Sequence, residues 1–261
     1  MPFTDADGVR LHWQEAGAGT PVLLIMGASF SSALWYPVIP ALSAHHRVIW
    51  FDNRGTGDSG WTVESPISTL AGDARGVLDA AGVERAHVYG ISLGGVIALQ
   101  LALESPERVS SLVLGATGAF TADKRRAPKA AQVVFRLPRG ALLALSKRRL
   151  YGPACLPEKV AADLAVLRVD KTERKALVAQ QNALRAYSVT LEEIATLSMP
   201  ALVLHGTADL VAKPAWGTEL AATLPNATLL TYDGAGHNYL VAAGDQANSD
   251  LLAFLDDVDG R

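Results

Sequence analysis

Short runs of mostly apolar residues recur along the chain, and each is followed by a glycine-rich or polar turn. The clearest runs span residues 22–26, 47–51, 109–114, 201–205 and 228–232. A continuous apolar run of this length predicts a strand that is covered on both faces, as in a parallel sheet. Residues 9–15 instead alternate apolar and polar side chains, which predicts a half-exposed strand at a sheet edge.

Segments with helical periodicity alternate with these strands. They span residues 33–44, 67–81, 214–224 and 246–257, and a further apolar helix is expected directly after residue 92. Alternation of strand and helix predicts an α/β fold, in which a mostly parallel central sheet is flanked by helices on both faces.

The alternation lapses between residues 120 and 197, where no convincing strand pattern is found. Amphipathic segments occur there at 130–135, 141–150, 158–169 and 172–186, separated by prolines. A long helical insertion between two strands is typical of a cap over the carboxyl edge of the sheet. We therefore divide the chain into a core of residues 1–118, a helical cap of residues 119–197 and a second core part of residues 198–261.

One serine stands in a tight turn between a predicted strand and a predicted helix. The sequence Gly90-Ile91-Ser92-Leu93-Gly94 matches the G-x-S-x-G pattern of a nucleophile elbow. Glycines two positions before and after the serine leave this strained turn room to close. The five residues alone would also fit a glycine-rich turn whose serine caps the helix. The flanking strand and helix, and the partners downstream, favour the nucleophile.

A serine nucleophile needs a base within hydrogen-bonding reach and a third group that orients the base. Among six histidines, His237 lies in a glycine-rich loop after the last predicted strand, where such folds carry the base, whereas His205 fits a structural role. Asp209 follows a buried strand and is the predicted acid, with Asp233 as the competing candidate. The order Ser92, Asp209, His237 along the chain is the one that this architecture uses.

The oxyanion hole is expected from two backbone N–H groups. The first belongs to Leu93, which follows the nucleophile, and the second comes from the loop after residues 22–26. In that loop Ala28 is the predicted donor, and Ser29 is the alternative.

Length, charge and cysteine content narrow the setting. A chain of 261 residues suits one α/β domain with an insertion. It is 49% hydrophobic and 19% charged, and its net charge of −3 gives no attraction to nucleic acid or an anionic membrane. The single cysteine, Cys155, excludes an internal disulfide, and the first residues carry no secretory pattern. A cytoplasmic setting is therefore expected.

Four segments together are specific for one family. They are Gly90–Gly95, Asp52–Ser59, His205–Asp209 and Gly236-His237. In these segments the chain resembles the α/β-hydrolase fold superfamily, and within it the branch of small capped esterases, lactonases and cofactor-free haloperoxidases. The resemblance implies a Ser-His-Asp hydrolase that needs no metal and no organic cofactor, and a structural role for the turn at 52–59. The chain departs from the family at Met26-Gly27, where a His-Gly pair is usual.

The predicted function is hydrolysis of a small-molecule carboxylic ester or lactone through an acyl-enzyme, with no nucleic-acid or membrane partner. Two other classes share the fold: a receptor that binds a ligand with slow turnover, and a non-hydrolytic lyase or cyclase of a biosynthetic pathway. The sequence leaves the natural substrate and the oligomeric state open.

The predicted cap carries two further features. Between residues 124 and 149 there are nine Lys or Arg residues and no Asp or Glu. This basic segment would attract an anionic substrate or a weakly acidic surface. Alternatively it would be the solvated exterior of the cap, balanced by acidic residues elsewhere, which is the commoner case. Gln180, Gln181, Asn182 and Tyr187 would either line the pocket from a cap helix or form the exposed face of that helix.

Overall fold

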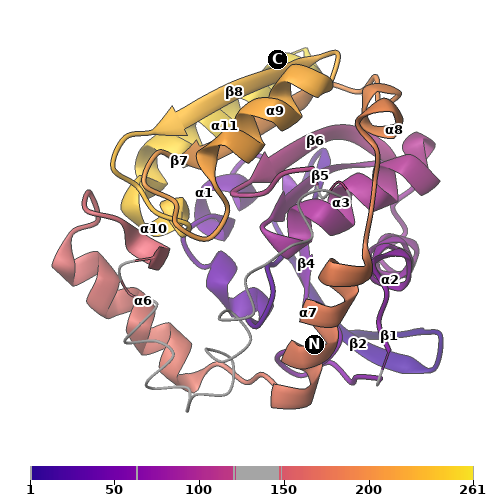
Figure 1. The fold of residues 1–261 in the computed structure, drawn as a ribbon. Coiled ribbons are helices and arrows are strands. Elements are labelled where there is room, and N and C mark those ends of the chain that lie inside the picture. The colour runs from indigo at the N-terminus through magenta and orange to yellow at the C-terminus, as the bar shows by residue number, and fades with distance from the viewer. Residues whose placement is uncertain (1, 63, 120, 122–146, 148, 261) are drawn as a thin grey trace.

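The computed structural model describes residues 2–62, 64–119, 121, 147 and 149–260. Within these residues the chain forms an eight-stranded sheet in the order β1-β2-β4-β3-β5-β6-β7-β8 (Figure 1). The strands are β1 (Phe3–Ala6), β2 (Val9–Ala16), β3 (Pro21–Ile25), β4 (Arg47–Phe51), β5 (Ala86–Ile91), β6 (Val109–Gly115), β7 (Ala201–Gly206) and β8 (Ala227–Tyr232). β2 pairs antiparallel with β1 and β4, and all other neighbours pair parallel. The mostly parallel sheet is confirmed.

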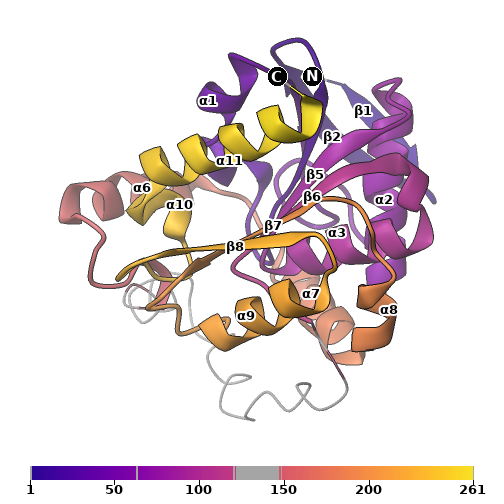
Figure 2. The same ribbon diagram turned by 90° about the horizontal axis from the view of Figure 1, so that it is seen from above.

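Helices cover both faces of the sheet. They are η1 (Ser32–Trp35), α1 (Ile39–Ser43), α2 (Ile67–Ala80), α3 (Leu93–Glu104), η2 (Pro106–Arg108), α6 (Pro157–Val169), α7 (Arg174–Ala186), α8 (Leu191–Ala195), α9 (Pro214–Thr223), α10 (Tyr239–Ala242) and α11 (Gly244–Asp259). Figure 2 shows α1 and α11 on one side of the sheet and α2, α3, α8 and α9 on the other.

The apolar runs of the central strands are explained by this arrangement. Along β3, Val22 and Leu24 pack into the cluster beneath α1 and α11, whereas Leu23 and Ile25 pack into the cluster with α2 and α3. Successive side chains of a strand point to opposite faces. Because both faces are buried, every position of the strand is apolar.

The strand at residues 9–15 was expected at the edge of the sheet, and this expectation is wrong. A further strand, β1, pairs with β2 on its outer side through a tight hairpin. The turn consists of Asp7 and Gly8, both with positive φ (50° and 75°), which is the geometry that Asp-Gly favours between two strands.

The single helix expected at 33–44 is also wrong, because the structure has a 3-10 helix (η1) and a short α-helix (α1) there. Pro37 and Pro40 explain the break. Neither has an N–H to donate, so a continuous helix would lose hydrogen bonds at both positions, whereas Pro40 fits the first turn of α1.

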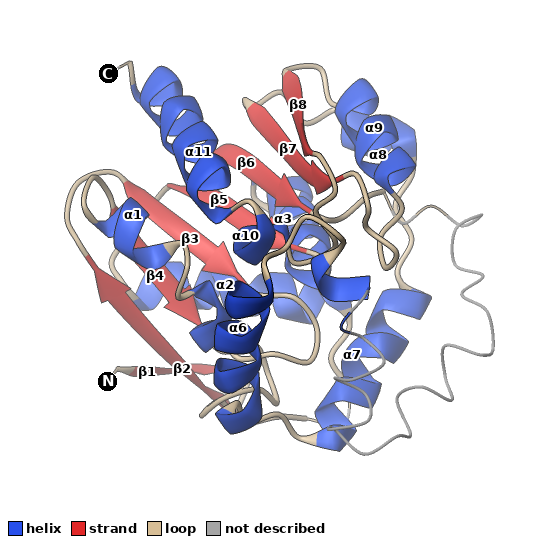
Figure 3. Cartoon of the chain, turned by 90° about the vertical axis from the view of Figure 1, so that its left-hand side faces the viewer, coloured by secondary structure: helices blue, strands red, loops and turns tan. Residues whose placement is uncertain are grey.

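The helical cap insertion follows β6, and its described helices are α6, α7 and α8. α6 and α7 match the amphipathic segments expected at 158–169 and 172–186, and α6 packs on α10 and η1. Figure 3 shows α6 and α7 beyond the carboxyl ends of the parallel strands. The segment at 130–135, and nearly all of those at 141–150 and 124–149, lie outside the described residues. None of the described helices combines the length and apolar character that crossing a bilayer requires.

Candidate active site

Ser92 lies between the end of β5 and the start of α3. Its backbone has φ 55° and ψ −119°, a strained conformation for a residue with a side chain. The Ser92 N–H donates to the Gly115 carbonyl of the neighbouring strand (2.8 Å), which fixes the turn against the sheet.

The glycines around Ser92 are required by close backbone contacts. A Cβ atom at Gly90 would overlap the Gly94 carbonyl, and one at Gly94 would overlap the Ile25 carbonyl at the end of β3. The strand-to-helix turn can therefore close only if both positions lack a side chain. This is the mechanical reason for the glycine spacing seen in the sequence.

An aspartate and a histidine from two later loops meet at the same edge of the sheet. Asp209 follows β7 and His237 follows β8, and His237 Nδ1 lies 2.8 Å from Asp209 Oδ2. The other carboxylate oxygen of Asp209 accepts the N–H groups of Val211 (2.7 Å) and Ala212 (2.9 Å). Since an ionised carboxylate can only accept, His237 Nδ1 carries the hydrogen and Nε2 has the free lone pair of a base.

The electrostatics of this pair favour the ionised aspartate. Burial alone would raise the pKa of Asp209, but hydrogen bonds from His205 and His237, the charge of His237 and the Val211 N–H outweigh it. Together they lower the pKa of Asp209 to about 2.

His205 is buried and takes the structural place that the sequence predicts. Its Nε2 donates to the Ala212 carbonyl (3.0 Å) and lies 3.4 Å from Asp209 Oδ2. The competing acid, Asp233, is exposed and accepts a hydrogen bond from the Thr207 hydroxyl (3.2 Å). The structure thus brings Asp209 to His237 and directs Asp233 elsewhere.

Ser92 and His237 line one pocket at this edge. The rest of its described lining is mainly apolar: Met26, Gly27, Ala28, Phe30, Leu34, Ile91, Leu150, Leu167, Asn238 and Leu240. Both side chains belong to the described part of the chain and lie in this pocket, and no direct hydrogen bond joins Ser92 to His237. Gly27 lies against Ser92, since a Cβ atom placed there would be 3.2 Å from the Ser92 Cβ.

The two predicted oxyanion donors flank this serine. Leu93 is the first residue of α3, where backbone N–H groups lack partners within the helix. Ala28 lines the pocket next to Gly27. The alternative donor, the Ser29 N–H, is instead bound by the side-chain oxygen of Gln180 (3.0 Å). This occupancy favours Ala28 over Ser29.

Several cap residues meet the site in ways that the sequence did not predict. Gln180 neither lines the pocket nor lies exposed, because its side chain is buried between two core loops. Asp163 on α6 accepts hydrogen bonds from Tyr36 (3.0 Å), Tyr151 (2.6 Å) and Asn238 (3.1 Å), the residue after His237. No local pattern marks such residues, because their partners are distant in sequence.

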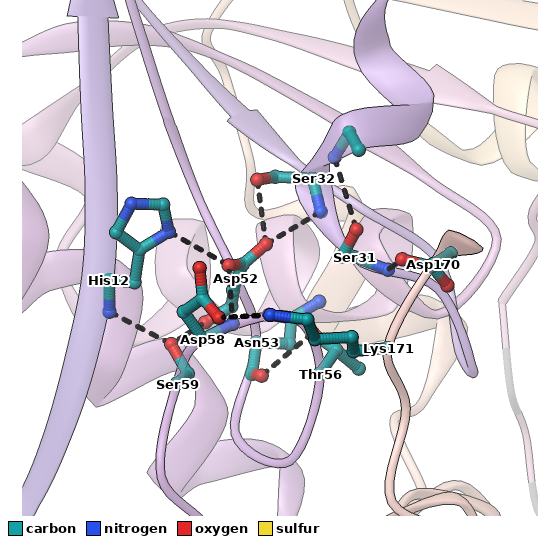
Figure 4. Close-up of polar contacts among 11 residues, drawn as sticks. His12, Ser31, Ser32, Asp52, Asn53, Thr56, Asp58, Ser59, Asp170 and Lys171 are labelled. Carbon is teal, nitrogen blue, oxygen red and sulfur yellow. Dashed lines mark hydrogen bonds and ion pairs between the residues drawn. The ribbon is translucent and has the colours of Figure 1, made fainter. Parts of the chain in front are cut away.

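The turn at 52–59 has the structural role that the family resemblance implies. The buried Asp52 carboxylate accepts hydrogen bonds from His12 Nδ1 (2.8 Å), from the N–H and hydroxyl of Ser32 (2.8 and 2.7 Å) and from the Asp58 N–H (3.0 Å) (Figure 4). Among the residues described, no cluster of three or more His, Cys, Asp or Glu side chains is placed to hold a metal ion.

Comparison with known proteins shows the family of the chain. The model of the alpha/beta hydrolase fold family matches residues 20–241, so the chain belongs to the α/β-hydrolase family. A protein of Azorhizobium caulinodans with the provisional name carbamate hydrolase RutD is 33% identical, over 99% of this chain and 100% of that protein.

Solved structures of lactone-cleaving enzymes also align over nearly the whole chain. The enol-lactonase from Burkholderia xenovorans LB400 has a TM-score of 0.86 and 25% identity over 97% of this chain and 99% of that one. Est816, described as an N-acyl homoserine lactone degrading enzyme, has a TM-score of 0.84 and 28% identity over 97% and 100%. The relatives are hydrolases of the esterase and lactonase branch that the sequence motifs indicate.

Proposed function

We propose that this protein is a serine hydrolase that cleaves a carboxylic ester or lactone of a small to medium organic substrate through an acyl-enzyme. The observation that carries the proposal is the Asp209–His237 pair, whose imidazole shares a pocket with Ser92 on its strained turn. The lactonase relatives support it.

In the proposed reaction, His237 Nε2 takes the proton from the Ser92 hydroxyl while Oγ attacks the substrate carbonyl carbon. Asp209 holds the ring and stabilises the imidazolium that forms. The N–H groups of Leu93 and Ala28 donate to the negatively charged carbonyl oxygen. The tetrahedral intermediate then expels the alcohol, which takes the proton from His237.

Water releases the acyl group in the second half of the cycle. His237 takes a proton from the water, whose oxygen attacks the acyl carbon, and the same two N–H groups stabilise the second intermediate. Ser92 leaves with the proton from His237, and the free enzyme is restored. For a lactone, the alcohol and the acid remain parts of one product.

The pocket lining supports an apolar, uncharged acyl group. Met26, Phe30, Leu34 and Leu167 offer carbon surface, and burial of each substrate CH₂ contributes about 0.8 kcal/mol. A carbamate, named for one relative, has similar carbonyl chemistry but carries a polar nitrogen on the carbonyl carbon where an ester carries a carbon group, and that nitrogen gains nothing from burial against an apolar lining. We therefore rank esters and lactones with a short alkyl chain above carbamates.

Covalent labelling with a fluorophosphonate tests the nucleophile. The wild type should be labelled, and Ser92→Ala should lose the label, because the probe reacts with an activated serine. Ser198→Ala, at an exposed serine between α8 and β7, is the matched control and should label like the wild type. A wild type that resists the probe contradicts the proposal and leaves the receptor or lyase alternatives.

An activated ester then distinguishes acyl transfer from other chemistry on the same serine. A burst of product equal to the enzyme concentration is expected, followed by steady turnover as the acyl-enzyme is hydrolysed. Turnover of a panel of alkyl esters, lactones and carbamates at equal concentration ranks the substrate classes. A labelled enzyme that hydrolyses none of them would sink the hydrolase assignment.

A further inference from the structure

Residues 27–32 form the oxyanion loop, which connects β3 to η1 and carries Ala28. The core holds both ends of this loop. Asn53 Nδ2 donates to the Met26 carbonyl just before it (2.8 Å), and the Asp52 carboxylate accepts the N–H and hydroxyl of Ser32 at its far end (Figure 4). The middle of the loop, where Ala28 meets the pocket, has other partners.

Cap side chains hold this middle part. Gln180 on α7 accepts the Ser29 N–H through Oε1 (3.0 Å), and the Thr172 hydroxyl donates to the Ser29 carbonyl (2.8 Å). Asp170 Oδ1 accepts the Ser31 N–H (3.2 Å), as Figure 4 shows. Both polar backbone groups of Ser29 are therefore bound by side chains of the segment that follows α6.

Ser29 depends on these contacts because its backbone is strained. Its φ is 78°, in the left-handed region that residues with a Cβ atom avoid. Rotation about this bond moves the chain before it, which contains Ala28. Loss of the two partners would let Ser29 relax and would shift Ala28, which lines the pocket together with Ser92.

The side-chain amide of Gln180 is fixed in the orientation that accepts the Ser29 N–H. Its side chain is 1% exposed, and its Nε2 donates to the Arg54 carbonyl (3.2 Å) while Oε1 faces Ser29. Arg54 is held in turn by a bidentate ion pair with the buried Asp73 (2.5 and 2.7 Å). If the amide were flipped, its NH₂ group would face the Ser29 N–H and its oxygen would face the Arg54 carbonyl. Only the observed orientation therefore makes both hydrogen bonds.

We propose that Gln180 and Thr172 are positioning residues that complete the oxyanion hole from the cap. The inference rests on the proposed function, because it concerns the donor Ala28 of that reaction. It adds that the cap, beyond enclosing the substrate, sets the geometry that stabilises the tetrahedral intermediate.

The first test is Gln180→Met, which keeps the side-chain length and removes both hydrogen bonds. Removing one oxyanion donor costs about 10²–10³ in kcat, and a displaced donor should cost less, about 10- to 100-fold. KM should change by less than about 3-fold, because the substrate ground state does not use the hole. Binding of a trifluoromethyl ketone, which forms a tetrahedral oxyanion with Ser92, should weaken in parallel with kcat.

Two comparisons separate positioning from general destabilisation. Gln181→Met, at the next position of α7, is the matched control and should keep wild-type kcat, since the structure places Gln181 outside the described pocket lining. Thr172→Val should lower kcat, and Thr172→Ser, which retains the hydroxyl donor, should restore it. All variants are measured well below the Tm determined for each.

The outcomes are distinct. A wild type that neither labels nor turns over an ester overturns the proposed function, and this inference with it. An active wild type with unchanged kcat and unchanged ketone binding in Gln180→Met overturns the inference alone. A lower Tm with normal kcat in that variant also contradicts it, because the contacts would then serve stability and not the oxyanion.

Discussion

The Asp209 carboxylate stays charged although its side chain is completely buried. Two backbone N–H groups, His205 and His237 replace the water that burial removes. The pKa of the folded protein's Asp209, about 2, lies below the ordinary value of 3.8. A group with a lowered folded-state pKa stabilises the fold above its unfolded pKa and loses that contribution as the pH falls towards the folded value.

Asp209→Asn should therefore change the pH dependence of stability. At pH 5 the wild-type free energy of unfolding includes a contribution of roughly 2 kcal/mol from this pKa difference, and the variant lacks it. The difference in free energy of unfolding between the wild type and the variant should become smaller as the pH falls from about 4 to about 2. Urea unfolding at pH 5, 4 and 3 measures it.

Asp233→Asn supplies the control for this experiment. Its carboxylate is exposed, so at pH 5 the substitution should change the free energy of unfolding by less than about 1 kcal/mol. A pH-independent gap for Asp209→Asn would show that Asp209 titrates alike in the folded and unfolded states, contrary to this expectation.

Single residues differ in how far the sequence reveals them. Ser92 and His237 stand in glycine-rich motifs whose spacing has a local mechanical cause, so they could be predicted, and Asp209 followed from its place after a buried strand. The sequence singled out Gln180 but could not predict its role, because its partners are backbone atoms 151 and 126 positions away. Its burial depends on how the cap meets the core, which periodicity along one helix does not encode.

Among the elements, α6 is tied to the core by one buried acid. Asp163 is 1% exposed and accepts hydrogen bonds from three groups: the hydroxyls of Tyr36, before α1, and of Tyr151, before α6, and the Asn238 amide next to His237. The loop that carries His237 is also bound to residues 149–151 through the backbone, including the Asn238 N–H on the Leu150 carbonyl (2.6 Å). α6 and this loop therefore share one polar junction.

Asp163→Ala should destabilise the protein by about 2–4 kcal/mol, because three donors lose a buried acceptor and each unsatisfied group is costly. Urea unfolding at pH 7 measures the loss. Glu158→Ala, at an exposed position of the same helix, should change stability by less than about 1 kcal/mol. Equal effects of both substitutions would contradict the role of the junction.

The elements that the sequence predicts well have one strong local signal. The central strands and the helices at 67–80 and 214–223 agree with the expected ranges within one or two residues. β1 escaped prediction because its four residues have no apolar face, and its place comes from the Asp7-Gly8 hairpin. α8 is similarly short and depends on a capping box formed by Thr190 and Glu193.

Across the whole molecule, different groups of residues lie at the carboxyl ends and at the amino ends of the parallel strands. The candidate site occupies the carboxyl edge. Near the amino ends of β5 and β6, His87 Nδ1 lies 2.7 Å from the Ser111 hydroxyl, and its Nε2 lies 3.0 Å from Asp259 at the end of α11. This chain of a serine, a histidine and an aspartate resembles a triad in composition, but Ser111 is completely buried. It ties the last helix to the sheet.

Ser111→Ala should therefore lower stability without lowering turnover. Loss of one buried hydrogen bond costs about 1–2 kcal/mol, and kcat should stay within about 2-fold of the wild type because the site is at the opposite edge. Ser110→Ala, whose side chain points to the other face of β6, is the control for the substitution itself. A large loss of kcat at unchanged stability would refute this division between the edges.

The family and the mostly parallel sheet could be predicted from the order of the motifs and strands. The division of the chain into core and cap at residues 118 and 197 stays a prediction. Cap boundaries depend on contacts between segments, and the sequence gives them no marker comparable to the glycines of a nucleophile elbow. The cytoplasmic setting likewise stays a prediction from composition.

The contacts at Ser29 have a consequence for engineering. Exchanging the cap of this enzyme for that of a relative, as a route to new substrates, would also remove the side chains that bind both polar groups of Ser29. A chimaera that keeps Thr172 and Gln180 in place should retain its turnover. If the new cap lacks these side chains, residues 27–32 of the core would have to be redesigned together with the cap.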